Sequence, residues 1–185
     1  MKHKQDKLEK PERLAELQPA ETLRRVGFED GQVLADIGAG SGIFTIPAAR
    51  TTDSTVYALE TDPVMLRIID GKAQREGLTN IKLVEVSGDR FDIEAGVVDL
   101  ALLVTVLHEI GDKAIMLEEI GRILKGGGRL LVIEFNKRET SMGPPMAIRL
   151  DKSEAAAVLA AAGFSRTDGF ELGDHMYGLV FTKDK

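Results

Sequence analysis

The sequence of 185 residues contains no cysteine and no tryptophan, and it has only two tyrosines. Without cysteine, the chain has no disulfide, thiolate metal site, thiol nucleophile or iron–sulfur cluster. This composition fits a reducing compartment. The shortage of large aromatics leaves no cage rich in Tyr or Trp. The three histidines, His3, His108 and His175, include no pair spaced four residues apart and so give no signal of a metal site.

Long apolar segments are also missing. The longest strongly apolar run covers residues 100–107, far short of the roughly 20 residues that a membrane span needs. Residues 1–7 are charged and lack the apolar core of a signal peptide. We therefore expect no membrane span and a cytoplasmic protein.

Charge of one sign does not dominate. Lys and Arg number 24 against 30 Asp and Glu, a formal net charge of −6. This balance argues against a broad basic face that would hold nucleic acid. The length suits one domain of ordinary globular composition.

Short apolar runs alternate with helical patterns along the chain. The predicted strands cover residues 33–37, 55–60, 80–86, 97–106, 129–135, 165–170 and 176–182. The predicted helices cover residues 11–17, 19–26, 43–50, 63–76, 113–124 and 153–162. Asp62 and Asp112 cap two of them, and Gly77 and residues 126–128 end them.

This alternation predicts βαβ units in an α/β fold, a Rossmann-like, doubly wound parallel sheet. The connection between the last two strands is too short for a parallel crossover, so these strands should pair antiparallel. The pattern offers one boundary, near residue 30. Residues 1–30 would form a helical N-terminal arm of the same domain, and residues 31–185 the α/β body.

A glycine-rich segment, Asp36-Ile37-Gly38-Ala39-Gly40-Ser41-Gly42, lies between a predicted strand and a helix. Glycines there allow a sharp turn and close approach of a ligand. Glu60 ends the second strand, where an acid can accept hydrogen bonds from both ribose hydroxyls of a nucleoside. Together these features predict a site for a nucleoside-containing cofactor; the alternative is a tight turn and a surface glutamate.

The dinucleotide fingerprint G-x-G-x-x-G/A fits poorly, because Ile43 stands where a small residue should pack. No G-x-x-x-x-G-K-[ST] motif occurs, which argues against a P-loop nucleotidase. A nicotinamide-dependent oxidoreductase stays as an alternative, since Gly38, Gly40 and Glu60 permit it.

Five segments in order resemble the class I S-adenosylmethionine-dependent methyltransferases. They are residues 33–42, 59–62, 88–89, 99–109 and 124–130. The resemblance covers about residues 20–183 and is nearest to the small ubiquinone/menaquinone-biosynthesis-type enzymes. It implies a sheet in the order 3-2-1-4-5-7-6 with strand 7 antiparallel. It also implies S-adenosyl-L-methionine as cofactor and S-adenosyl-L-homocysteine as product.

The resemblance also implies a set of cofactor-binding positions. These are Asp36, Gly38, Ala39, Gly40, Ser41, Gly42, Glu60, Thr61, Asp62, Met65, Gly88, Asp89, Arg90 and Thr105. The glycines would shape the loop around the methionine part, Asp36 would help hold its ammonium, and Glu60 would take the ribose hydroxyls.

For the adenine, the resemblance implies that Thr61 and Met65 flank the ring and that Asp89 binds its amino group beside Arg90. Thr105, at the end of the fourth strand, would line the methionine and sulfonium region.

Methyl transfer from a sulfonium requires mainly alignment and exclusion of water, and a base only where the acceptor must lose a proton. His108, next to Glu109 after the fourth strand, is the candidate catalytic base. Otherwise it lines the pocket, orients another group or lies exposed in a loop. Glu134, near the end of the fifth strand, either faces the acceptor or is a solvated edge residue.

The acceptor side should come from two variable places. One is the arm, where His3, Leu14 and Leu17 would fold over the cofactor. The other is the loop 136–150, where Arg149 would pair with an acidic acceptor and apolar residues would line the pocket; these apolar residues are Met142, Pro144, Pro145 and Met146. Alternatively, the arm is a plain helical flank and the loop a connector.

The sequence therefore predicts a methyltransferase that acts on an unidentified small-molecule acceptor, with no nucleic-acid partner and with a homodimer as one possible assembly. Besides the oxidoreductase, a cofactor-binding module without catalysis stays open as an alternative.

Overall fold

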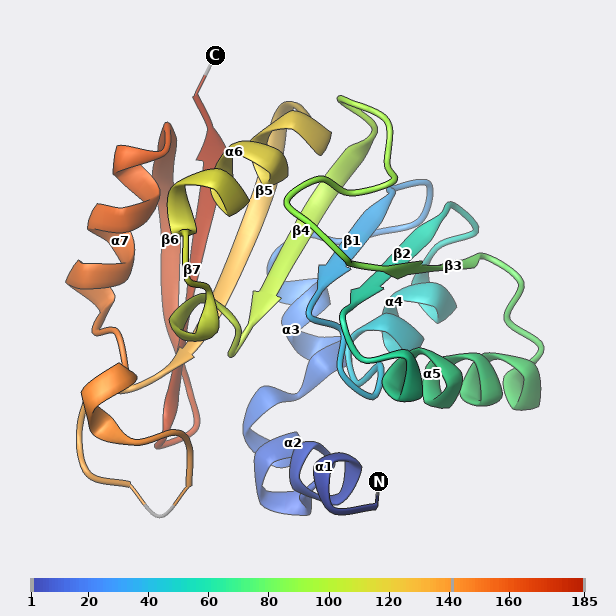
Figure 1. Cartoon of the computed structure of the whole chain (residues 1–185), viewed down its shortest axis with the longest axis horizontal. Coiled ribbons are helices and arrows are strands. Elements are labelled where there is room, and N and C mark those ends of the chain that lie inside the picture. The colour runs from blue at the N-terminus through green and yellow to red at the C-terminus, as the bar shows by residue number, and fades with distance from the viewer. Residues whose placement is uncertain (1, 141, 185) are drawn as a thin grey trace. The chain divides into compact units, whose positions relative to one another are not determined.

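The computed structural model describes residues 2–140 and 142–184, with the side chains of residues 2–4 left out of the description. Seven strands form one sheet in the order β3-β2-β1-β4-β5-β7-β6 (Figure 1). This is the predicted order, including the antiparallel β7. The chain divides into two compact units, residues 1–92 and 93–185. The boundary near residue 30 that the sequence suggests, between arm and body, stays a prediction.

The first unit contains three strands and five helices of the described chain. Its strands are β1 (Leu34–Ile37), β2 (Val56–Glu60) and β3 (Ile81–Glu85), and they pair parallel. Its helices are α1 (Lys2–Leu8), α2 (Pro11–Leu17), α3 (Pro19–Arg25), α4 (Thr45–Thr51) and α5 (Pro63–Glu76). Helices α4 and α5 contact each other and pack on β2.

Local signals in the sequence explain α5 well. Asp62 caps the helix, accepting from the Val64 N–H at 2.9 Å, and Pro63 occupies the first turn. Gly77 ends the helix in the left-handed conformation, at φ +67°. Buried Ile69 and Met65 then face the core. The predicted helix 63–76 is confirmed at both ends.

The second unit contains the other strands and helices. Its strands are β4 (Val98–Val104), β5 (Leu124–Phe135), β6 (Phe164–Leu172) and β7 (Met176–Lys183). Its helices are α6 (Lys113–Ile123) and α7 (Lys152–Ala161), with 3-10 turns η1 (Leu107–Glu109) and η2 (Met146–Ile148). Strands β4 and β5 pair parallel, and β7 pairs antiparallel with both β5 and β6.

Burial within this unit follows the pattern of the sequence. Leu100 to Leu103 on β4 are fully buried, as expected of a central parallel strand. Helix α6 starts at the predicted cap, Asp112, which accepts from the Ile115 N–H at 3.1 Å. Helix α7 begins with a capping box between Asp151 and Glu154, so its cap lies two residues before Ser153.

The glycine run of residues 126–128 does not end α6, contrary to the prediction. The helix ends at Ile123, and Leu124 already pairs with Val98 on β4. The next pair joins Leu100 to Arg129, so the glycines loop out of the ladder between two paired positions. Gly127 has a φ of +78°, which such an excursion requires.

Two further differences concern the first unit. Helix α1 lies in the charged segment for which the sequence pattern predicts no helix before residue 11. Helix α4 begins at Thr45 rather than Ile43, because the left-handed Gly42 (φ +81°) turns the chain before the helix can start.

Candidate functional site

The glycine-rich loop after β1 is tied to the end of β2. Gly38, Gly40 and Gly42 all have positive φ, at +73°, +54° and +81°. The N–H groups of Gly38 and Ala39 both donate to the Leu59 carbonyl, at 2.8 and 2.9 Å. The predicted turn is therefore present and is held by hydrogen bonds, and only glycine adopts its backbone conformation without strain.

Glu60, the last residue of β2, is 8% exposed and holds this loop. Its Oε2 accepts from the Gly40 N–H at 2.8 Å. Its Oε1 accepts from the N–H groups of Thr61 and Asp62, at 3.0 and 3.1 Å. The structure thus brings together four of the predicted site residues, with the carboxylate placed over the glycine loop.

Asp36 lies beneath the same loop and is 2% exposed. Its Oδ2 accepts from the Thr45 hydroxyl at 2.6 Å, which joins β1 to the start of α4. Burial raises the pKa of Asp36 to about 6, with a further rise from the Glu60 charge, against the opposing hydrogen bonds from Thr45. A cation close to Asp36 would therefore stabilise the ionised form of its carboxyl group.

Ser41 gives an independent sign that the loop suits a polar ligand. Ser41 is 1% exposed, and in the part of the chain that the structure describes its hydroxyl makes no hydrogen bond of ordinary geometry, although it lies close enough to the Glu9 carboxylate to help lower the pKa of that group. Buried hydroxyls are usually satisfied, so an unpaired one is a place where a ligand atom fits. The buried acids, the glycine turn and this hydroxyl thus gather several polar groups at one loop, and their roles toward a cofactor stay predictions.

The N-terminal arm contacts the loop through residues that the sequence pattern did not single out. A Cβ placed on Gly40 would lie 2.9 Å from the Leu8 Cδ1, so this leucine packs directly on the loop. The Lys72 ammonium bridges the Glu9 carboxylate at 2.7 Å and the Ser41 carbonyl at 2.6 Å. No local motif marks these residues.

The residues predicted for the arm behave differently. Leu17 is fully buried, Leu14 is half-buried, and the His3 side chain lies outside the described residues. None of the contacts described for the loop involves them.

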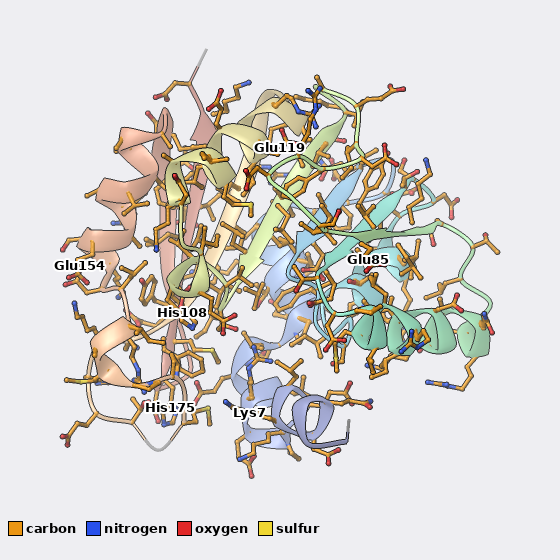
Figure 2. All side chains as sticks on the ribbon, in the orientation of Figure 1. Lys7, Glu85, His108, Glu119, Glu154 and His175 are labelled. Carbon is orange, nitrogen blue, oxygen red and sulfur yellow. The ribbon has the colours of Figure 1, made fainter. Side chains whose placement is uncertain are left out.

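The positions that the resemblance assigns to adenine are mostly exposed. Gly88, Asp89 and Arg90 form an exposed bend after β3, whose last residue, Glu85, is labelled in Figure 2. Met65, by contrast, is 1% exposed on α5. The roles of these four residues stay predictions.

In the second unit, His108 and Glu134 form a buried pair. His108 lies on η1 (Figure 2), and its side chain is 3% exposed. Its Nδ1 lies 2.7 Å from the Glu134 Oε2, and its backbone N–H donates to Oε1 at 3.1 Å. The alternatives of an exposed loop histidine and a solvated edge glutamate are therefore wrong, because Glu134 is only 1% exposed.

The environment of His108 favours its charged form. Burial acts to lower the pKa of His108, and Lys113 lowers it further. The hydrogen bond and charge of Glu134, with the charge of Glu109, outweigh both and raise the pKa above its ordinary value.

Thr105, just after β4, has a left-handed backbone, at φ +56°. This conformation is an outlier for a β-branched residue and persists only where the surroundings enforce it. Its N–H donates to the Ile133 carbonyl at 2.7 Å. Its role toward a cofactor stays a prediction.

The predicted acceptor loop, residues 136–150, is organised by Arg149, which is 5% exposed. Its guanidinium donates, over 2.7 to 3.1 Å, to the carbonyls of Asn136, Arg138, Met142 and Pro144 and to the Thr140 hydroxyl. Most of its N–H donors therefore serve the loop itself, and the pairing of Arg149 with an acidic acceptor stays a prediction. Met146 stays 46% exposed on the loop surface.

Arg149→Met is expected to lower the free energy of unfolding by about 2 kcal/mol, because four carbonyls of the loop lose the charged donor that ties them together. Urea denaturation measures this change. The matched control is Arg138→Met, which removes an exposed arginine from the same loop and should change stability by less than about 0.5 kcal/mol. Equal losses in both variants would contradict the organising role.

Two absences bear on chemistry. Among the side chains that the structure describes, no group of three or more His, Asp or Glu is arranged to hold a metal ion. Within the same residues, no helix has the length and apolar character that crossing a bilayer requires.

Comparison with known proteins identifies the fold and its family. Residues 35–132 match the model of the family described as "Methyltransferase domain". A crystal structure of a SAM-dependent methyltransferase from Aquifex aeolicus superposes with a TM-score of 0.90 at 24% identity, covering 96% of this chain and 95% of that one.

Two similar sequences have names that mention quinones. The ubiquinone/menaquinone biosynthesis C-methyltransferase of Marinomonas sp. is 29% identical over 124 residues, 65% of this chain and 49% of that protein. The demethylmenaquinone methyltransferase of Lactococcus lactis is 29% identical over 117 residues, 62% of this chain and 46% of that protein. The chain thus spans about half the length of these relatives.

Proposed function

Because the chain belongs to the methyltransferase domain family, we propose that it takes its methyl group from S-adenosylmethionine and transfers it to a small-molecule acceptor. The observation that carries this proposal is the carboxylate of Glu60, held over the glycine loop at the end of β2. An acid in this position is suited to a ribose, and the loop to the rest of an adenosyl amino acid.

The proposal assigns the cofactor to residues that meet at the loop. Glu60 would accept from the ribose hydroxyls, Asp36 would attract the methionine ammonium, and the Ser41 hydroxyl would bond a polar ligand atom. Gly38 and Gly42 would let the backbone approach the ligand closely. The bound cofactor supplies an electrophilic methyl group, and the protein's share is to hold, align and keep water out.

The acceptor is proposed from the relatives' names. Both are named for enzymes that methylate quinone precursors. A reduced quinone ring is therefore the first acceptor class to test. A cytoplasmic location, a possible homodimer and the absence of a nucleic-acid partner stay predictions of the sequence.

The test has two steps. Calorimetric titration with S-adenosylmethionine, S-adenosylhomocysteine and NADH should show binding of the two adenosyl amino acids and none of NADH. Binding of NADH alone would revive the oxidoreductase alternative. Transfer of labelled methyl groups to an acceptor panel then separates an enzyme from a binding module, which would bind the cofactor and methylate nothing.

The pKa of Asp36, about 6, predicts how cofactor affinity depends on pH. Its ionised form attracts the methionine ammonium and its protonated form does not, so binding should weaken as the pH falls through that value. Between about pH 7 and about pH 5 the ionised fraction falls about tenfold, and the affinity should fall by up to the same factor. Calorimetry at a series of pH values measures it.

Two controls isolate Asp36 in this experiment. Asp36→Asn should bind the cofactor weakly and with little dependence on pH over this range. Methylthioadenosine lacks the amino acid part, so its affinity for the wild-type protein should change little. An affinity of Asp36→Asn that falls as steeply as that of the wild type would assign the titration to another group.

A further inference from the structure

The buried pair His108 and Glu134 is not among the residues assigned above to the cofactor, and its geometry fixes which ring nitrogen of His108 carries a proton. Glu134 is the penultimate residue of β5, and its carboxylate receives both the backbone N–H and the Nδ1 of His108. An ionised carboxylate only accepts hydrogen bonds, so Nδ1 must carry the proton. In neutral His108 the unprotonated nitrogen is therefore Nε2.

The second ring nitrogen is left available. Among the described residues, the group recorded near Nε2 is the Glu109 carboxylate, at 3.8 Å, beyond hydrogen-bond distance. The Glu109 side chain is 73% exposed, so it moves away easily. His108 thus has one nitrogen fixed by a buried acid and the other free to take a proton.

The charges around His108 also favour the binding of a proton by its ring. Glu134 on β5 and Glu109 on η1 raise its pKa, and Lys113 on α6 opposes them. On β7, Tyr177 pairs in register with Glu134, and its hydroxyl donates to the Leu150 carbonyl at 2.8 Å. Burial raises the pKa of Tyr177, so this hydroxyl stays neutral and adds no competing charge. A protonated His108 is therefore stabilised mainly by Glu134.

The backbone leading to His108 is held under strain. Thr105 keeps its left-handed conformation through its bond to Ile133, and His108 is tied to the next residue of β5. Two successive residues of one strand thus fix the segment 105–108. Backbone strain that the surrounding structure maintains is typical of segments that hold a functional side chain in one orientation.

We propose that His108 is the general base of the methyl transfer and that Glu134 is its positioning residue, for an acceptor such as the hydroquinone proposed above that must lose a proton. This rests on the proposed function. The acceptor's electron pair forms the bond to the methyl carbon, and the electrons of the breaking carbon–sulfur bond stay on sulfur. The acceptor's proton passes to the Nε2 of His108, and the imidazolium later releases it to water. An acceptor without a proton to lose, such as a pyridine nitrogen, is methylated without help from His108 and Glu134.

The first test needs no acceptor. In protein labelled with ¹⁵N at histidine, and assigned with the variant His108→Gln, the His108 ring should carry its proton on Nδ1 when neutral. Glu134→Gln keeps the size and an acceptor oxygen but removes the charge, so the pKa of His108 should fall. A neutral ring with its proton on Nε2 would overturn the base assignment.

The second test measures labelled methyl transfer to 1,4-naphthohydroquinone and to 4-phenylpyridine under reducing conditions. With the hydroquinone, His108→Gln should lower kcat about a hundredfold, the usual contribution of a general base. Its rate should recover at alkaline pH, where the acceptor ionises without help. Glu134→Gln should lower the rate about tenfold at neutral pH and shift the pH profile with the His108 pKa.

The controls separate this proposal from a failure to fold and from the proposed function. His175→Gln, a substitution in the turn between β6 and β7, should leave kcat unchanged (Figure 2). Calorimetry should show unchanged binding of S-adenosylhomocysteine in every variant. Methylation of 4-phenylpyridine but not of the hydroquinone, or a loss in His108→Gln that no pH restores, would overturn the proposal. Methylation of neither probe would count against the proposed acceptor, while the ring tautomer would still decide the base.

Discussion

Glu60→Ala is expected to weaken the binding of S-adenosylhomocysteine about a hundredfold. Each hydrogen bond from a ribose hydroxyl to a charged carboxylate contributes about 1.5–3 kcal/mol, and Glu60 would make two. A loss of about 3 kcal/mol corresponds to roughly a hundredfold in affinity. The substitution also frees the Gly40 N–H, which Glu60 holds at 2.8 Å. Isothermal calorimetry at neutral pH measures the change directly.

The neighbouring strand supplies the matched control. Glu85 pairs in register with Glu60 across β2 and β3, ends its own strand in the same way, and is exposed. Glu85→Ala should therefore leave the affinity within about twofold. Glu60→Gln keeps two polar side-chain atoms without the charge, so its affinity should lie between those of Glu60→Ala and Glu85→Ala. Similar affinities for Glu60→Ala and Glu85→Ala would remove Glu60 from the cofactor site.

The parts of this site that the sequence predicts correctly depend on short-range signals. The turn at Gly38 and Gly40 needs positive φ, and a capping Asp62 followed by Pro63 is typical of a helix start. The strand ending at Glu60 follows from an apolar run of four residues, 56–59. Each signal lies within a few residues of the feature that it predicts, so composition and spacing are enough.

The parts that the sequence does not predict depend on contacts between distant residues. Leu8 packs on Gly40 and Lys72 reaches the Ser41 carbonyl, each across about thirty positions of the chain with no local pattern. Only the burial of Glu134 shows that it is not a solvated residue at the sheet edge. The partners of Arg149 are mostly backbone carbonyls, which no residue type reveals. These features follow from tertiary packing.

Gly42→Ala is expected to lower the free energy of unfolding by about 3 kcal/mol. Gly42 has a φ of +81°, which costs an L-residue about 1–2 kcal/mol. An added Cβ would also lie 3.0 Å from the Ile69 Cγ1, and Ile69 is fully buried on α5. Overfilling a packed core costs about 1–3 kcal/mol more, because neighbours must move. Urea denaturation, with an unchanged slope, measures the sum.

The substitution Gly77→Ala separates the cost of backbone strain from the cost of overfilling the core. It also has a positive φ, at +67°, but an added Cβ there would meet nothing within 4 Å. Gly77→Ala should therefore cost about 1 kcal/mol, from backbone strain alone. Because the Gly42 N–H donates to the Ala39 carbonyl and its own carbonyl accepts from Ile46, movement at Gly42 should also weaken binding of S-adenosylhomocysteine. Equal stability losses in the two variants would show that Ile69 gives way freely and that the loop is not packed against α5.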